Sequence, residues 1–158
     1  MSKWRKLREL SWAYRRLLLQ AAALLIYAKL RLPFIDFRAV PAAGATAQSA
    51  APSETMLARA QSIARVVSIA AAHCPVTIVC LHRSLVLWWL LRRNGIPCAL
   101  RLGARTEYGP FEAHAWVQCA GVALDQLDAH LLRYRPFGEA VVPVGRRQPW
   151  RLVTRRVP

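Results

Sequence analysis

Hydrophobic positions in the first thirty-odd residues recur at spacings of three and four, which predicts an amphipathic helix that Pro33 ends. These positions are Trp4, Leu7, Leu10, Tyr14, Leu17, Ala21, Leu24 and Ala28. The first half of the helix is basic and the second half is apolar. It could therefore pack on the core of its own domain, or lie on a membrane surface or a partner protein. We favour packing on the core.

A second helix is predicted over residues 53–72, with Ser53 or Thr55 as its N-cap. Its candidate core positions are Ala58, Ile63, Val66, Val67 and Ile69. Pro75 then breaks the chain. Residues 80–94 form a strongly helical run that a glycine closes, so a third helix should begin within a residue or two of its first residue, a cysteine.

The second half of the chain has the alternation typical of strands. Strands are predicted over residues 96–102, 113–119 and 122–125, the last two forming a hairpin around Ala120-Gly121. Residues 141–144 could add an edge strand, because they include a proline and proline is tolerated at edges. Helices first and an antiparallel sheet afterwards indicate an α+β fold.

A chain of 158 residues with 55% hydrophobic residues is most simply one domain with a real core. A stretch of small residues bounded by prolines indicates a flexible linker over residues 41–53. We therefore expect a basic and apolar helical region over 1–40, the linker over 41–53, and the folded core over 54–158.

The formal net charge of +15 invites a nucleic-acid interpretation. The excess positive charge comes almost entirely from arginine, however, and these arginines are scattered along the chain. No RNA-binding motif, zinc-finger spacing or dense basic block is visible. We expect no nucleic-acid partner and favour a solvated arginine-rich surface, with attraction to an acidic partner or anionic lipid as the alternative.

Four cysteines could form two disulfides in a secreted protein. No convincing signal peptide precedes them, because the apolar run Leu17–Ala28 lacks a small-residue cleavage site. That run is also shorter than the roughly 20 residues that cross a bilayer. We expect reduced thiols and a cytoplasmic protein, with membrane-surface contact through the N-terminal helix left open.

Cys80, His114 and Asp125 follow one another in the order and in the elements that a thiol active site needs. Cys80 would start a helix, whose free N–H groups lower the pKa of a thiol and could bind an oxyanion. Taken singly, the cysteine could be a small buried hydrophobe and the histidine structural. The joint arrangement favours a catalytic triad.

The predicted hairpin allows an independent check of the triad. If Ala120-Gly121 is a two-residue turn, Trp116 faces Asp125, and His114 and Asp125 project from the same face as diagonal neighbours. Asp128 would project from the other face, and a three-residue loop would reverse this parity. Asp125 is therefore the expected orienting acid, with Asp128 as the backup.

No cofactor or metal site is expected. Four residues could be imagined as metal ligands, but their spacing matches no structural zinc pattern. They are His73, Cys74, Cys80 and His82. We interpret Cys74, Cys98 and Cys119 as core or incidental thiols.

Several stretches together resemble the transglutaminase-like peptidases of lasso peptide biosynthesis. They are Cys80-Leu-His-Arg-Ser-Leu85, Gly95-Ile96, His114-Ala-Trp-Val117, Gly121 and Asp125. The spacings between the three candidate triad residues are typical of that family, and the resemblance covers roughly residues 53–128. It implies a transglutaminase-like, papain-like cysteine peptidase fold, with the small sheet packed on the helix that carries the cysteine.

The resemblance also implies an activity and partners. Cys80 would be the nucleophile, His114 the general base and acid, and Asp125 the orienting residue of a peptidase that removes the leader from a ribosomally made precursor peptide. An ATP-using cyclase then closes the macrolactam ring. Nothing in this chain looks like the family's small leader-recognition domain, so we expect that domain to be a separate partner protein.

Two other functions remain open from the sequence. The same triad could serve an acyltransferase or transglutaminase-like amidase, in which an amine replaces water. Alternatively, the protein could be a non-catalytic basic adaptor that binds membrane or nucleic acid through its N-terminal helix.

Overall fold

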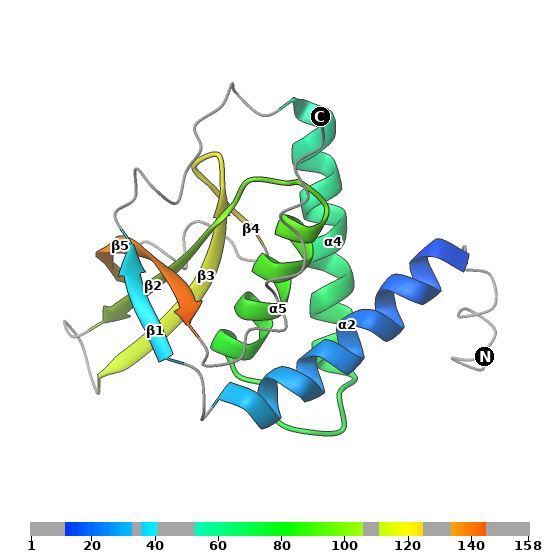
Figure 1. Ribbon diagram of the computed structural model, residues 1–158, viewed down its shortest axis with the longest axis horizontal. Helices are drawn as coiled ribbons and strands as arrows, with labels where there is room; N and C mark the ends of the chain where they lie inside the picture. The colour runs from blue at the N-terminus through cyan, green and yellow to red at the C-terminus, as the bar shows by residue number, and fades with distance from the viewer. Residues whose placement is uncertain (1–11, 33–35, 41–52, 106–110, 125–133, 145–158) are drawn as a thin grey trace.

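Three helices and one antiparallel sheet make up the part of the chain that the computed structural model describes, which is residues 12–32, 36–40, 53–105, 111–124 and 134–144 (Figure 1). The helices are α2 (Trp12–Arg31), α4 (Glu54–Ala72) and α5 (Cys80–Arg93). The strands are β1 (Asp36–Val40), β2 (Ala99–Arg105), β3 (Glu112–Cys119), β4 (Val122–Leu124) and β5 (Arg135–Val144). The predicted α+β fold is confirmed.

Helix α4 begins where the sequence predicted. Ser53 is the N-cap, and its hydroxyl accepts a hydrogen bond of 3.3 Å from the backbone N–H of Met56. Of the predicted core positions Ile63, Val66 and Val67 are buried, whereas Ala58 and Ile69 are exposed. The prediction was wrong there because small residues occupy the buried face instead. The additional buried positions are Ala60, Ala64 and Ala70.

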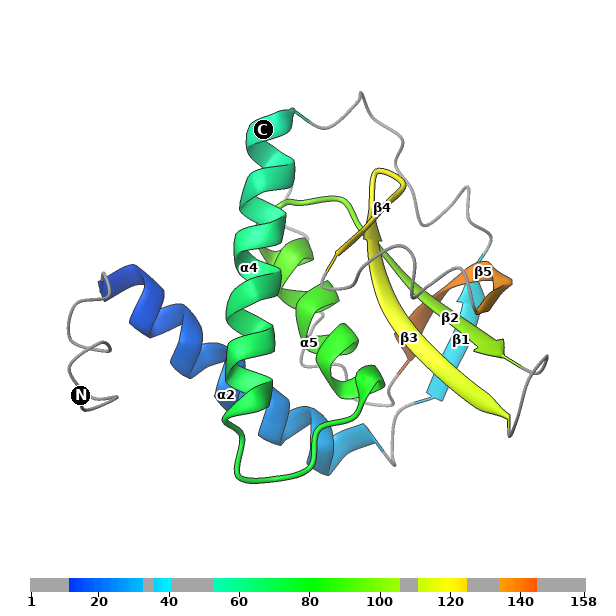
Figure 2. The same cartoon turned by 180° about the vertical axis from the view of Figure 1, so that it is seen from behind.

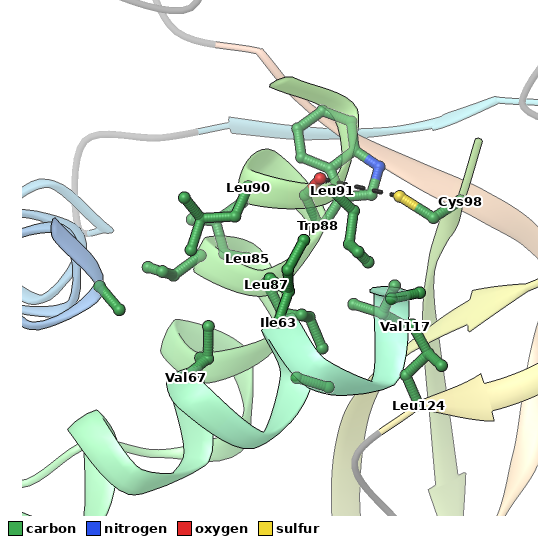
Figure 3. Close-up of a cluster of buried hydrophobic side chains, with 14 of the residues drawn as sticks. Ile63, Val67, Leu85, Leu87, Trp88, Leu90, Leu91, Cys98, Val117 and Leu124 are labelled. Atoms are coloured by element: carbon green, nitrogen blue, oxygen red, sulfur yellow. Dashed lines mark hydrogen bonds between the residues drawn. The ribbon is translucent and has the colours of Figure 1, made fainter. Parts of the chain in front are cut away.

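Helix α5 is the centre of the core (Figure 3). It begins at Cys80, as predicted, and ends in a Schellman motif. Gly95, at φ 71°, donates to the carbonyl of Arg92 at 3.0 Å, and Ile96 donates to that of Leu91 at 2.9 Å. Its buried apolar side chains are Leu85, Val86, Leu87, Trp88, Leu90 and Leu91. The helix therefore packs on α4 and on the sheet at the same time.

Helix α2 packs on the other two helices. Ala21, Leu25 and Ala28 are buried in the same core cluster as α4 and α5. Both views show α2 crossing next to these helices, with its N-terminal half reaching past α4 (Figures 1 and 2). The favoured interpretation, packing on the domain's own core, is therefore confirmed. Among the described helices, none is long and apolar enough to cross a membrane.

The sheet has the strand order β1-β5-β2-β3-β4, and every neighbouring pair is antiparallel. Strand β5 was expected at an edge but lies inside the sheet, because β1 covers its outer side. Its prolines, Pro136 and Pro143, each lie one residue from an end of the strand, where a ladder hydrogen bond is most easily lost.

Residues 36–40, placed by the sequence in a helical region, form strand β1 instead. Their strand partner, β5, lies near the other end of the chain, so local pattern could not reveal the pairing. The boundaries 1–40, 41–53 and 54–158 of the expected regions stay predictions.

Candidate active site

Cys80 is the first residue of α5, and its side chain is half-buried. The first intrahelical bond runs from the N–H of Arg83 to the carbonyl of Val79, at 3.3 Å. The N–H groups of residues 80–82 therefore have no acceptor within the helix. They carry the positive end of the helix dipole, which stabilises an anion such as an oxyanion formed beside them.

His82 completes this helix start. Its Nδ1 accepts a hydrogen bond of 3.3 Å from the backbone N–H of Val79. In a capping box, a glutamate at this position of the helix accepts the same bond. Burial lowers the pKa of His82, and the positive charge of Lys29 lowers it further. The imidazole is therefore held neutral, which is the form that can accept this bond.

His114 lies on β3 near two aromatic side chains. Its ring is 4.9 Å from that of Tyr134, at 30°, and 6.3 Å from that of Trp116, at 14°. Directly opposite on β2 is Gly103. The side chain of His114 is half-buried and lies near both aromatic rings.

A buried hydrogen bond ties the cysteine helix to the histidine strand. The hydroxyl of Ser84 donates to the carbonyl of Ala115 at 2.9 Å. Ser84 follows Cys80 by one helical turn, and Ala115 follows His114 by one residue, so this bond fixes the start of α5 against the middle of β3. Together with the shared hydrophobic core of α5 and β3, this bond sets the relative placement of the two candidate residues.

Tyr134 lies close to both candidate residues. Its ring packs on His114, and the charge of a Cys80 thiolate acts on its hydroxyl. The pKa of Tyr134 is raised chiefly because its hydroxyl donates to Glu112 and because it is buried, and the Cys80 charge adds to this. Cys80 and His114 therefore both lie in the neighbourhood of Tyr134.

The β3–β4 hairpin has the predicted two-residue turn. Cys119 pairs with Val122, and Val117 pairs with Leu124. Ala120 and Gly121 have φ of 49° and 84°, as a type I′ turn requires. The predicted parity is confirmed up to Leu124.

Asp125 and Asp128, the expected orienting acid and its backup, lie outside the described residues. Their roles stay predictions, as do the catalytic roles of Cys80 and His114. On the opposite face of β3, Ala115, Val117 and Cys119 are buried, whereas Ala113 is exposed.

All four cysteines are free thiols, and two of them are core residues. Burial raises the pKa of Cys98 to about 12, and its thiol faces the carbonyl of Trp88 at 3.7 Å. Burial also raises the pKa of Cys119, whose thiol faces the carbonyl of Pro97 at 3.3 Å. Both therefore remain protonated at neutral pH and are poor nucleophiles.

Three residues near His114 were missed from the sequence: Tyr134, Glu112 and Arg105. The Tyr134 hydroxyl donates to Glu112 Oε1 at 2.7 Å, and Arg105 Nη2 donates to Glu112 Oε2 at 2.7 Å. Glu112 could have been noticed, because it lies two residues before His114, the spacing that places two side chains on the same face of a strand. Tyr134 carried no signal, because the sequence around it showed no strand pattern.

In the part of the chain described, no group of His, Cys, Asp and Glu could hold a metal ion.

Replacing Gly103 by alanine should destabilise the site. A Cβ there would lie 2.7 Å from the carbonyl oxygen of Arg135 and 3.0 Å from the Trp116 ring. The backbone oxygen cannot give way without weakening β2–β5 pairing, so the free energy of unfolding should fall by roughly 1–3 kcal/mol. Urea unfolding of Gly103→Ala beside the wild type measures this loss, and equal stability of the two proteins would contradict it.

Residues 22–151, which include all the described strands, match the Transglutaminase-like superfamily. The chain belongs to this superfamily. Its members are in general cysteine peptidases or acyltransferase-like enzymes, usually with a cysteine triad. The expected transglutaminase-like fold is therefore confirmed. Comparison with curated proteins and with solved structures gave no match.

Proposed function

We propose that this transglutaminase-like protein is a cysteine peptidase that removes the leader from a lasso peptide precursor. The observation that carries the proposal is the buried bond from Ser84 to Ala115. Ser84 belongs to the stretch Cys80-Leu-His-Arg-Ser-Leu85 and Ala115 to the stretch His114-Ala-Trp-Val117. These are the two blocks of sequence that most resemble those peptidases. The bond brings both blocks to one place in the fold.

In the proposed reaction, the Cys80 thiolate attacks the carbonyl carbon of the scissile peptide bond. The oxyanion forms beside the unpaired N–H groups at the start of α5, whose positive dipole end stabilises it. The imidazolium of His114 then protonates the leaving amine, and a thioester with the leader remains on Cys80. A water molecule, deprotonated by His114, hydrolyses the thioester and releases the leader with a free carboxylate. Asp125 would orient the imidazole.

The proposal includes partners. A separate small protein would bind the leader and present it to Cys80, and an ATP-using macrolactam cyclase would consume the amine that cleavage frees. The test combines the purified chain, a lasso precursor and its leader-recognition protein, with mass spectrometry of the products. A core peptide with a free amine and a leader with a free carboxylate are expected. An intact precursor in the complete mixture would contradict the proposal.

Acyl transfer is the second candidate, because the superfamily to which the chain belongs includes acyltransferase-like enzymes. The thioester on Cys80 would be the same, and an amine would replace water as the acceptor. Adding a primary amine to the same mixture distinguishes the two. A leader joined to that amine, formed in preference to the free carboxylate, would favour the transferase.

A further inference from the structure

We propose that Tyr134, Glu112 and Arg105 form a positioning chain that holds the imidazole of His114 beside Cys80. We call these three residues the Tyr134 chain. The inference rests on the proposed function, in which His114 exchanges protons with the Cys80 thiol. None of the three touches the reacting atoms in this proposal, so they are positioning residues.

The contacts of the Tyr134 chain run in one direction, from solvent to the imidazole. Arg105 is directly opposite Glu112 in the β2–β3 ladder, and their side chains form an ion pair of 2.7 Å. The second oxygen of Glu112 accepts from Tyr134 at 2.7 Å. Tyr134 is only 5% exposed, and its ring meets that of His114. Each member therefore limits the freedom of the next, ending at the imidazole.

Charge supports the same arrangement. The hydrogen bond from Tyr134 holds the pKa of Glu112 below its usual range. Desolvation raises this pKa in part, whereas the charge of Arg105 and its hydrogen bond lower it further. The charge of His114 acts on Glu112 in the same direction. Because such coupling is reciprocal, the Glu112 carboxylate favours the imidazolium form of His114. An imidazolium is the partner that stabilises a thiolate at Cys80.

The test measures alkylation of Cys80 by iodoacetamide at pH 6.5, followed by peptide mass spectrometry, and needs no substrate. Tyr134→Leu removes the ring, Tyr134→Phe removes only its hydroxyl, and Glu112→Gln removes the carboxylate charge. We expect the Cys80 rate to fall about tenfold in Tyr134→Leu and roughly threefold in the other two, because each tenfold loss of thiolate equals one unit of thiol pKa.

Matched controls lie away from the site. Tyr27→Phe removes a hydroxyl on α2 that contacts Arg31, and Glu54→Gln removes an exposed carboxylate in the first turn of α4. Both should keep the wild-type rate. At pH 9 all variants should converge, because a free thiol ionises unaided near pH 8.5. Among the described residues, the charged and titratable groups coupled to Tyr134 and Glu112 are Cys80, His114 and Arg105. Asp125, which the proposed reaction also assigns to His114, lies outside them.

The outcomes separate the two proposals. A Tyr134→Leu protein whose Cys80 reacts at the wild-type rate at pH 6.5 would overturn the Tyr134 chain alone. Unfolding would remove the helix N-terminus and the imidazole from Cys80 and could lower its rate by itself, so only variants with the circular dichroism spectrum and the urea-unfolding midpoint of the wild type are compared. A wild-type Cys80 that reacts no faster than the half-buried Cys74 would contradict the proposed function, and the Tyr134 chain with it.

A second inference concerns the side of α2 that faces away from the core. Trp12, Leu19, Ile26 and Leu30 are 73%, 71%, 39% and 66% exposed. Their spacings of seven, seven and four place them on one side of the helix. We call these four residues the α2 outer face. On the opposite side, Ala21, Leu25 and Ala28 pack on the core, so the helix has two apolar sides, of which the fold covers one.

We infer that the α2 outer face binds the surface of an anionic bilayer. The exposed cations Arg16, Lys29 and Arg31 accompany the apolar row, and α2 contains no acidic residue. Lysine or arginine beside an apolar helix side is the combination that anionic lipid attracts. The net charge of +15 adds a long-range attraction of the same sign.

Vesicle sedimentation tests the α2 outer face. The full chain should sediment with phosphatidylcholine vesicles that contain about one third phosphatidylglycerol, and much less with phosphatidylcholine alone. The double variant Leu19→Gln/Ile26→Gln should lose this binding. Ile69→Gln on α4 is the matched control, because Ile69 is 41% exposed, close to Ile26 at 39%.

Two results would overturn the lipid assignment. Equal loss of binding in Ile69→Gln would show that the α2 outer face is not the contact. The second result is a wild type that does not bind anionic vesicles but forms a dimer, with Leu19→Gln/Ile26→Gln abolishing the dimer. The α2 outer face would then bind a second copy of the chain. Circular dichroism of each variant confirms that α2 is still folded.

Discussion

Cys80→Ala should abolish precursor cleavage, with a loss of roughly 10⁴-fold or more, because no other group can form the thioester. Cys80 alone among the cysteines combines a helix N-terminus with partial exposure. Burial holds Cys98 and Cys119 in the protonated form. The measurement is the initial rate of leader release with the recognition protein present, followed by mass spectrometry.

Cys74→Ala is the matched control for this prediction, since Cys74 is the other half-buried free thiol. It should cleave at the wild-type rate. Full activity of Cys80→Ala would show that the thiol chemistry is assigned to the wrong residue. If the chain were a basic adaptor, the wild type would cleave nothing, and its bound partner would dissociate with added salt.

His114→Asn should lower the rate of cleavage by about 10²–10⁴-fold, the range expected when a positioned general acid and base is lost. Asparagine keeps hydrogen-bonding capacity and similar size but cannot carry the proton to the leaving amine. His114 lies near Tyr134 and Trp116, so the shorter side chain should leave the strand in place. Cleavage rates at saturating precursor measure the effect on the chemical step.

His73→Asn is the control histidine variant. His73 is exposed at the end of α4, where its ring contacts only the carbonyl of Ile69 among the contacts described. It should leave the rate unchanged. An equal fall in both histidine variants would contradict a special role for His114. Asp125→Asn and Asp128→Asn test the orienting acid in the same assay. Only Asp125→Asn should reproduce part of the fall in cleavage rate that His114→Asn causes.

Local sequence signals predicted the parts of the site that are built from neighbouring residues. Pro75 before the cysteine and Gly95 after the helix bound α5 because each acts on its own backbone. Ala120-Gly121 predicted the hairpin register, since a two-residue turn leaves only one way to pair its flanks. For this reason the face shared by His114 and its predicted partner could be stated before the fold was known.

The parts that sequence reasoning missed depend on residues far apart in the chain. Tyr134 reaches His114 only because β5 pairs with β2 after a segment without strand pattern. Ser84 belongs to the block that resembles the family, yet its bond to Ala115 requires α5 to lie on β3. In both cases tertiary packing decides the contact, and no periodicity in the chain encodes it.

The pairing of β1 with β5 has a consequence for how the protein is made. Val40 pairs with Ala140, so β1 leaves the ribosome long before its partner exists. The three helices can collapse together first, because their contacts are closer in sequence. During that interval the outer side of β2 lacks its neighbour and is open to pairing with another nascent chain. Emergence of β5 is therefore the event that completes the sheet and brings Tyr134 to His114.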